Sequence, residues 1–363
     1  MRGLIVLLML LLVSAPARAE ETDRLIGSLD VSEWQQAAEE AGGELDVAGL
    51  IRALAAGELE FTPEGLIRLL QGILLGEAGG VRGQLMAYMG PALLWAVNRY
   101  LLRGGRLGEA AGQVCALAGM GVMLAAFSGH MALASDTVSR LGRLTGQVFP
   151  VLTGLMSASG QPGAAGAVQQ MVIFGGGALT AFLEKAMRVL CGSAAVLAAA
   201  GNLTGRIRLD GLFRLCRSAG NWLFGGIMAA FLGMTAMSGL MGGARDGVTI
   251  RAAKYAVDSL LPVVGGDVAD AMDGMVKSAA LVKNAAGVTG VIVMLSVSVR
   301  PVVRLALGML MCRLASALIE PVAEGPLSRC AAQLGEATQM LLAAVSVSAA
   351  LFMTLTGACL AMR

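Results

Sequence analysis

The residues whose spacing could serve chemistry are three aspartates, Asp267, Asp270 and Asp273, followed by Lys277. A spacing of three residues puts the carboxylates on one face of a helix, and Lys277 lies one turn beyond Asp273, where the two can pair. Two interpretations stay open. The row is either the solvated face of a helix at a membrane surface, or it lines a water-filled path or docks a basic surface of another subunit.

A second helical stretch precedes this row, and a Pro-Gly-Gly bend separates the two. The first stretch carries Arg251 and Lys254, and the bend contains Pro262, Gly265 and Gly266. We therefore predict that residues 244–284 form an amphipathic helical hairpin at the membrane surface, in which the two basic residues neutralise the aspartates across the bend. The candidate conduit or docking residues are Arg251, Lys254, Pro262, Gly265, Asp270, Asp273, Lys277, Lys283 and Asn284.

Signals of enzymatic chemistry are missing from the sequence. It contains no G-x-x-x-x-G-K-[ST] phosphate loop and no C-x-x-C metal spacing. The single histidine, His130, lies within an apolar run, where it is either a packed neutral residue or a functional group in the membrane. Aromatic residues make up only 4%, too few for a stacking surface for nucleic acid. We predict no enzyme activity, no cofactor, no metal and no nucleic-acid partner.

Composition predicts an all-α, polytopic membrane protein. Apolar residues make up 56% and charged residues 14% of the 363 residues, against about 25% charged in soluble domains. The mean hydropathy is +0.73, and 50 glycines are typical of helices that pack closely in lipid. The charge is uneven, since residues 20–80 carry thirteen acidic and three basic residues while the whole chain is +2.

The chain divides into five predicted regions. Residues 1–19 read as a signal peptide with Ala17 and Ala19 at its cleavage site, the alternative being an uncleaved anchor. Residues 20–80 form an acidic, exported helical region. Residues 81–243 are membrane helices, with 148–163 a candidate re-entrant or broken segment. The hairpin at 244–284 and the C-terminal membrane helices at 285–363 complete the chain.

About seven membrane spans follow from the apolar runs, each compared with the roughly 20 residues that cross a bilayer. Among them are the separate spans 164–183 and 186–201, and 285–299 and 302–319. Basic loops orient the spans, because positive residues concentrate on the cytoplasmic side. These residues are Arg99, Arg103 and Arg106 in one loop and Arg206, Arg208, Arg214 and Arg217 in the other.

Small residues recur at a spacing of four along one span, at Gly225, Ala229 and Gly233. This spacing lets helix backbones approach closely. The stripe either packs inside one bundle or serves self-association into a homo-oligomer and docking onto a partner's helices.

Several motifs fall in one ordered run that begins at Asp246. They are Asp246-Gly247-x-Thr249-x-Arg251-x-Ala253-Lys254, Leu261-Pro262-Val263-x-Gly265, Asp270-Ala271-x-Asp273, Leu281-x-Lys283-Asn284-x-x-Gly287 and the ASALIEP sequence at 315–321. Together they resemble the stage III sporulation protein AE family of endospore-forming bacteria. The resemblance covers the chain from the signal peptide to the C-terminus, although the N-terminal part matches only in character.

The resemblance implies an integral membrane core component of an eight-protein, channel-forming or secretion-like assembly that links mother cell and forespore. Its partners would be the lipid bilayer and the other subunits of the stage III sporulation assembly, including its ATPase and ring-forming proteins. It would lie in the mother-cell membrane around the forespore, with its N-terminal region in the intermembrane space, and would be required for late forespore development. A non-conducting scaffold for the other subunits is the alternative, and an independent ion-coupled transporter is weaker because no inverted repeat is visible.

Overall fold

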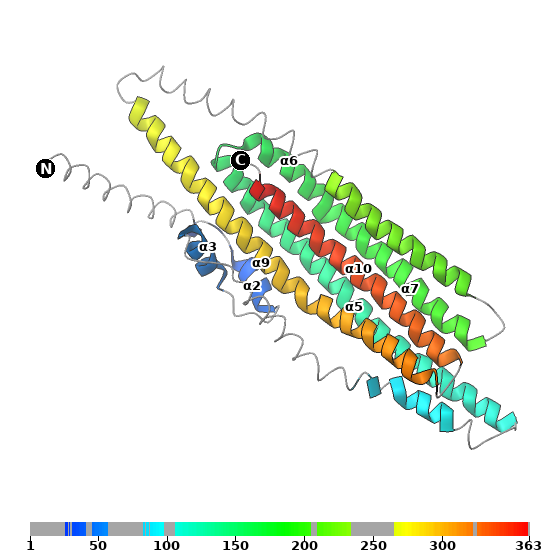
Figure 1. Cartoon of the computed structure of the whole chain (residues 1–363). Coiled ribbons are helices and arrows are strands. Elements are labelled where there is room, and N and C mark those ends of the chain that lie inside the picture. The colour runs from blue at the N-terminus through cyan, green and yellow to red at the C-terminus, as the bar shows by residue number, and fades with distance from the viewer. Residues whose placement is uncertain are drawn as a thin grey trace.

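A computed structural model describes residues 26–56 apart from 28, 30 and 41–45, residues 83–97 apart from 84 and 87, and residues 106–204, 209–233, 265–321 and 325–361. All regular elements among these residues are helices. The long helices run along one axis and form an elongated bundle (Figure 1). The prediction of an all-α membrane protein is confirmed, because four of these helices are long and apolar enough to cross a membrane.

Helix α5 (Arg106–Ala158) is a single helix of 53 residues. At 1.5 Å per residue it is about 80 Å long, more than twice the roughly 30 Å of a bilayer's hydrocarbon core. It ends in a turn where Gly160 has a φ of +81°, which glycine adopts without strain. Helix α6 (Pro162–Val172) follows, with a proline in its first turn, where no amide hydrogen is needed. Of the two alternatives for residues 148–163, the structure has the broken helix and not a separate re-entrant segment. These residues are the end of one helix, a turn and the start of the next.

Helix α6 continues without a break through η1 (Ile173–Leu179), a π-helix, into α7 (Thr180–Thr204). The prediction of separate spans at 164–183 and 186–201 was therefore wrong. Glu184 and Lys185 suggested a link between two spans, but they lie inside α7. A charged residue does not end a helix when its side chain finds a partner beside the helix, and Glu184 has one in Ser135.

Helix α9 (Gly265–Ile319) has 55 residues and α10 (Pro326–Ala361) has 36. Pro301 lies inside α9, where it has no amide hydrogen to donate to the carbonyl of Val297. The helix nevertheless continues, so the predicted spans 285–299 and 302–319 are one helix and not two. The predicted boundary between residues 284 and 285 also falls inside α9.

Buried apolar residues form two clusters. Helices α5, α9 and α10 each contribute one half to each cluster, while α7 contributes to the first and α6 to the second. The first cluster includes Phe127 of α5, Met187 of α7, Leu305 of α9 and Leu334 of α10. The second cluster includes Phe149 of α5, Val168 of α6, Met294 of α9 and Leu355 of α10. The two clusters therefore lie end to end along the bundle.

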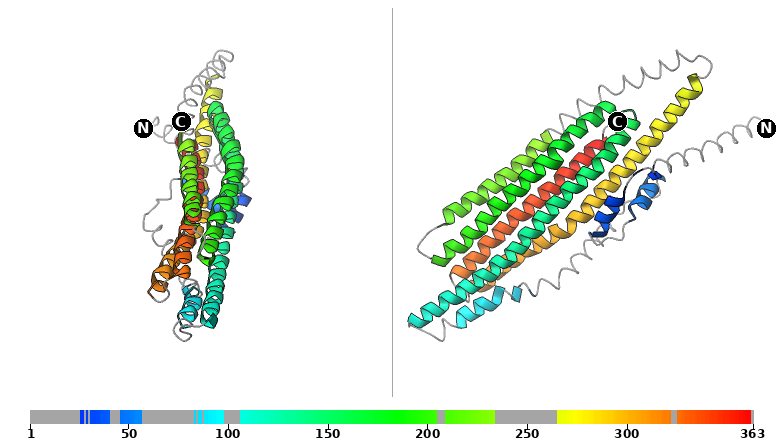
Figure 2. Two further views of the ribbon diagram at one scale, coloured as in Figure 1. Left: turned by 90° about the vertical axis from the view of Figure 1, so that its right-hand side faces the viewer. Right: turned by 180° about the vertical axis from the view of Figure 1, so that it is seen from behind.

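The N-terminal helices α2 (Ser32–Glu40) and α3 (Val47–Ala56) lie against the side of the bundle beside α9, as Figure 2 shows. Their inward faces bury Trp34, Ala38, Val47 and Ile51 in the second cluster. The side-chain oxygen of Gln35 accepts a hydrogen bond of 2.9 Å from the Val47 amide, which links the two helices. The acidic region thus contributes a small unit whose apolar face is completed by the bundle.

Candidate functional site

The structure places only some of the residues predicted for the conduit or docking site. Arg251, Lys254 and Pro262 lie outside the described residues. Gly265 is the first residue of α9, and Asp270 and Asp273 follow within its first turns. The pairing of Arg251 and Lys254 with these aspartates across the bend stays a prediction.

Three further predicted residues, Lys277, Lys283 and Asn284, lie on α9 and do not share one environment. Lys277 and Asn284 are exposed and seven residues apart, so they occupy one face of the helix. Lys283 turns inward and is only 3% exposed, close to Cys359 of α10. A lysine whose side chain is almost fully buried is rare in proteins, so Lys283 stands out among the predicted residues.

Charged side chains from three helices gather where the two apolar clusters meet, and we call this group the charged belt. It consists of Asp136, Arg140 and Arg143 of α5, Glu184, Lys185 and Arg188 of α7, and Arg300 and Arg304 of α9. The Ser135 hydroxyl donates a hydrogen bond of 2.7 Å to Glu184 and so joins α5 to α7 at this level. Arg188 also pairs with Glu184, one turn along α7.

A cavity of about 330 Å³ lies at the charged belt between α2, α5 and α9. Its walls include the apolar side chains of Leu144 and Val297. Its charged lining consists of Glu33, Glu40, Asp136, Arg140, Arg143, Arg300 and Arg304. Four arginines against three carboxylates give this lining a formal charge of +1. Within the described ranges, no three His, Cys, Asp or Glu side chains lie close enough together to hold a metal ion.

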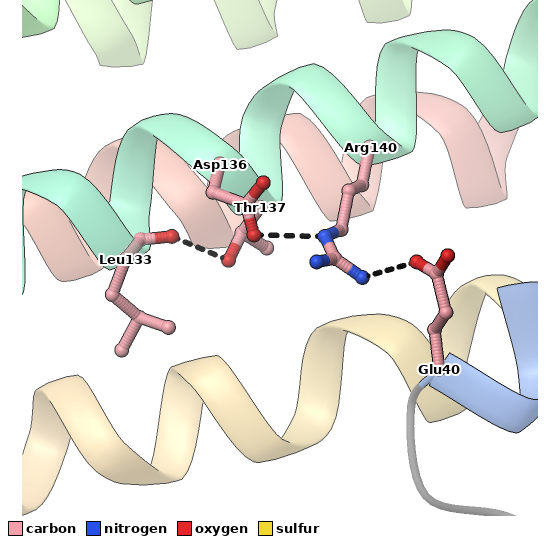
Figure 3. A network of polar contacts seen from close by, with 5 residues as sticks. All are labelled: Glu40, Leu133, Asp136, Thr137 and Arg140. Atoms are coloured by element: carbon pink, nitrogen blue, oxygen red, sulfur yellow. Dashed lines mark hydrogen bonds and ion pairs between the residues drawn. The ribbon is translucent and has the colours of Figure 1, made fainter.

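Arg140 lies between two carboxylates at the edge of this cavity (Figure 3). Its Nη1 is 2.6 Å from Oε2 of Glu40 on α2, and its Nε is 2.8 Å from Oδ2 of Asp136 one turn earlier on α5. Both ion pairs are substantially exposed, so each stabilises the fold by only about 0–1 kcal/mol. Only the pair with Glu40 joins α2 to α5, and Trp34 is the largest side chain that α2 buries against the bundle.

Sequence reasoning missed this cavity, although a signal for it was present. Asp136 and Arg140, and likewise Arg300 and Arg304, are spaced by four residues, which puts each pair on one helix face. The contact between Arg140 and Glu40, which are one hundred residues apart in the chain, depends on tertiary packing that no local pattern reveals.

Known proteins resemble this chain over most of its length. Residues 45–362 match the family described as stage III sporulation protein AE. The chain is similar to stage III sporulation protein AE of Bacillus subtilis (strain 168), with 23% identity over 352 residues, covering 95% of this chain and 87% of the relative. No solved structure matches it.

Proposed function

Because this chain belongs to the stage III sporulation protein AE family and so has a role in sporulation, we propose that it is an integral membrane core component of the channel-forming or secretion-like assembly that links mother cell and forespore. Its four apolar helices make it a multi-pass membrane protein. The observation that carries the proposal is the docking of α2 at the charged belt, with α3 beside it on α9. This docking puts a polar surface for partner subunits directly beside the apolar helices.

In this proposal the mother-cell membrane surrounds the half of the bundle that contains the first cluster. Most exposed large apolar side chains of the described helices lie in that half, where lipid would cover them. They include Val114, Leu117 and Val122 of α5, Val189 and Val196 of α7, and Leu310, Leu314 and Leu318 of α9. Ile173, Leu232 and Leu281 are the exceptions, in the other half.

The same half supports an orientation. At its far end α5 begins, α7 ends, α9 ends and α10 begins, close in sequence to Arg99, Arg103, Arg106, Arg206 and Arg208. The prediction that Arg214 and Arg217 lie in the same basic loop was wrong, because both lie inside a helix that begins at residue 210. The positive-inside rule puts this end in the mother-cell cytoplasm. The charged belt and the N-terminal helices then lie on the intermembrane side. A charge at the bilayer centre costs about 2.5–3.5 kcal/mol on insertion scales, so the belt belongs at a surface and not within the hydrocarbon.

The two candidate roles, a conduit and a scaffold, differ in whether solutes pass along a path that this chain lines. The bundle interior is filled by the two apolar clusters, so a conduit lined by this chain would run between subunits and not through one copy. This packing supports the second candidate, a scaffold that organises the ATPase and ring-forming subunits. Arg217 and Glu336 form a half-exposed ion pair of 3.0 Å within the proposed membrane half, and we expect a partner subunit to cover it.

The small-residue stripe also favours contacts with other chains. Gly225, Ala229 and Gly233 are all exposed, so they do not serve packing inside this bundle. Small exposed residues at a spacing of four permit the close approach of another helix. That helix belongs to another subunit or to a second copy of this chain.

Purification from sporulating cells tests the proposal. The tagged full-length chain, extracted in mild detergent, should bring down the other stage III assembly subunits, including the ATPase and a ring-forming protein. Deleting the chain should stop late forespore development, and the untagged gene product should restore it. Recovery of the chain alone, together with normal development in its absence, would rule the proposal out.

Thiol labelling distinguishes conduit from scaffold. In a protein lacking the six native cysteines, single cysteines are placed at 258, 270, 273 and 277 and exposed to a membrane-impermeant reagent in sporulating cells. Labelling at 270 and 273 that blocks forespore development when the reagent is bulky would favour the conduit. Protection of all four positions, with the partner subunits still co-purifying, would favour the scaffold.

We expect Lys283→Met to keep the thermal stability of the protein while it impairs forespore development. Methionine has a similar volume and no charge, so it avoids the desolvation penalty that a buried ammonium group carries. The purified variant should therefore melt at or above the wild-type temperature, yet fail to support forespore development if the Lys283 charge is used. The exposed neighbour Lys277→Met is the matched control. A variant at 283 that supports development fully would leave the lysine a packing residue only.

A further inference from the structure

We propose that the cavity at the charged belt is a binding site for the phosphate of an anionic membrane lipid. The proposal concerns how the protein meets the bilayer, and it stands whether the chain is a conduit or a scaffold. It rests on the arginines of the cavity, on the pairing of its carboxylates and on the level of the belt along the bundle.

The arginines line the cavity from two helices. Arg140 and Arg143 come from α5, and Arg300 and Arg304 come from α9 on the opposite wall. Each guanidinium carries five N–H donors in a planar fork that fits phosphate oxygens, so an arginine with one partner still has donors to offer. The volume of about 330 Å³ is at the lower end of small-molecule sites, which suits a headgroup more than a whole lipid.

The carboxylates of the cavity do not cancel this charge. Arg140 engages both Glu40 and Asp136, so two of the three carboxylates are already held by one arginine. Arg143, Arg300 and Arg304 add three more guanidinium groups to the lining, and Glu33 adds one more carboxylate. The field within the cavity therefore favours a group with one or two negative charges.

The level of the belt identifies the source of the anion. Helix α5 is about 80 Å long and a bilayer's hydrocarbon is about 30 Å thick, so only part of the helix can lie in lipid. The belt adjoins an apolar half on each side, and its charges exclude it from the hydrocarbon. Whichever half the bilayer surrounds, the belt lies outside the hydrocarbon, on the side where the lipid headgroups are. The phosphates nearest to the arginines are then those of lipids.

The test measures lipid binding to the full-length protein in neutral detergent by native mass spectrometry. Phosphatidylglycerol, phosphatidylcholine and inorganic phosphate are the probes. The test variant is Arg143→Gln with Arg300→Gln, which removes two guanidinium groups from the cavity. The control is Arg313→Gln with Arg329→Gln, which removes two exposed arginines that do not line it. Both variants are first required to melt like the wild type.

We expect phosphatidylglycerol to bind more tightly than phosphatidylcholine. The cavity variant should bind it at least about 10-fold more weakly, since two charge-assisted contacts are lost, while the control stays within about 2-fold of the wild type. Equal binding by the cavity and control variants would overturn the proposal. So would inorganic phosphate binding to the cavity when phosphatidylglycerol does not, because the anion would then come from solution.

A second variant covers the case in which the double substitution does not fold. Glu33 is an exposed residue of α2 and is the carboxylate of the lining that Arg140 does not hold. Glu33→Gln removes its charge and leaves all four arginines in place. It should strengthen phosphatidylglycerol binding by a few fold through lost repulsion. Glu39→Gln, on the same helix but outside the cavity lining, should change nothing. Unchanged or weaker binding by Glu33→Gln would contradict the proposal.

Discussion

Gly308→Val should lower the melting temperature of the purified protein by several degrees. A Cβ at Gly308 would lie 2.5 Å from Cε1 and 2.6 Å from Nε2 of His130, a rigid ring on α5 that is only 7% exposed. Because the ring cannot bend away as a flexible side-chain end would, α9 must shift from α5 along the first cluster. Overpacking of this kind costs about 1–3 kcal/mol. Thermal unfolding in detergent, followed by circular dichroism, measures the loss.

The control for this prediction lies beside the same histidine. Gly129→Ala adds a methyl group where nothing lies within 4 Å, so it should be neutral or slightly stabilising, since alanine is favoured over glycine in helices by roughly 0.5–1 kcal/mol. Removing the ring in the double variant Gly308→Val with His130→Ala should restore part of the lost stability. A Gly308→Val protein as stable as the wild type would show that the two helices are not in contact at this point.

Trp34→Ala should release α2 and α3 from the bundle. Trp34 is 1% exposed and packs into the second cluster, and truncating a buried tryptophan costs about 3–5 kcal/mol. Helix α2 has only nine residues, too few to be stable alone in water. Loss of the docking contact should therefore unfold it. Hydrogen–deuterium exchange of the full-length protein should show fast exchange across residues 32–40 and 47–56, with α10 still protected.

Glu39→Ala is the matched control on the same helix. Its carboxylate only accepts an exposed hydrogen bond of 2.8 Å from Gln35, so exchange in α2 should change little. If Trp34→Ala left the exchange of α2 as slow as in the wild type, the N-terminal helices would be held by something other than the second cluster. The co-purification of partner subunits should also fall in Trp34→Ala, because the proposed polar surface is lost.

Composition and apolar runs were sufficient to predict the helical membrane class, because lipid permits few other ways to satisfy the backbone. They failed at the helix boundaries. Glu184 with Lys185, and Arg300 with Pro301, look in the sequence like the ends of spans, yet each lies inside a helix. The reason is tertiary. Glu184 is held by Ser135 of α5, and Arg300 lines a cavity closed by α2.

In the candidate site too, local sequence patterns predicted some features, and others depended on tertiary packing. The ordered motifs beginning at Asp246 identified the family, since a long run of residues in order carries more information than one motif. Spacing also put Asp270 and Asp273 on a helix, as α9 has them. The inward turn of Lys283 and the contact of Glu40 with Arg140 depend on which helix lies opposite. A single sequence holds no direct record of those neighbours.

Thiol accessibility in membrane vesicles of known orientation tests most directly the claim that the charged belt marks the membrane surface. In a version without the native cysteines, single cysteines replace Arg143 in the belt and Leu117 and Val196 on the exposed apolar surface. A membrane-impermeant reagent on the intermembrane face should label position 143 and leave 117 and 196 protected. Rapid labelling of 117 and 196 together with protection of 143 would contradict the account.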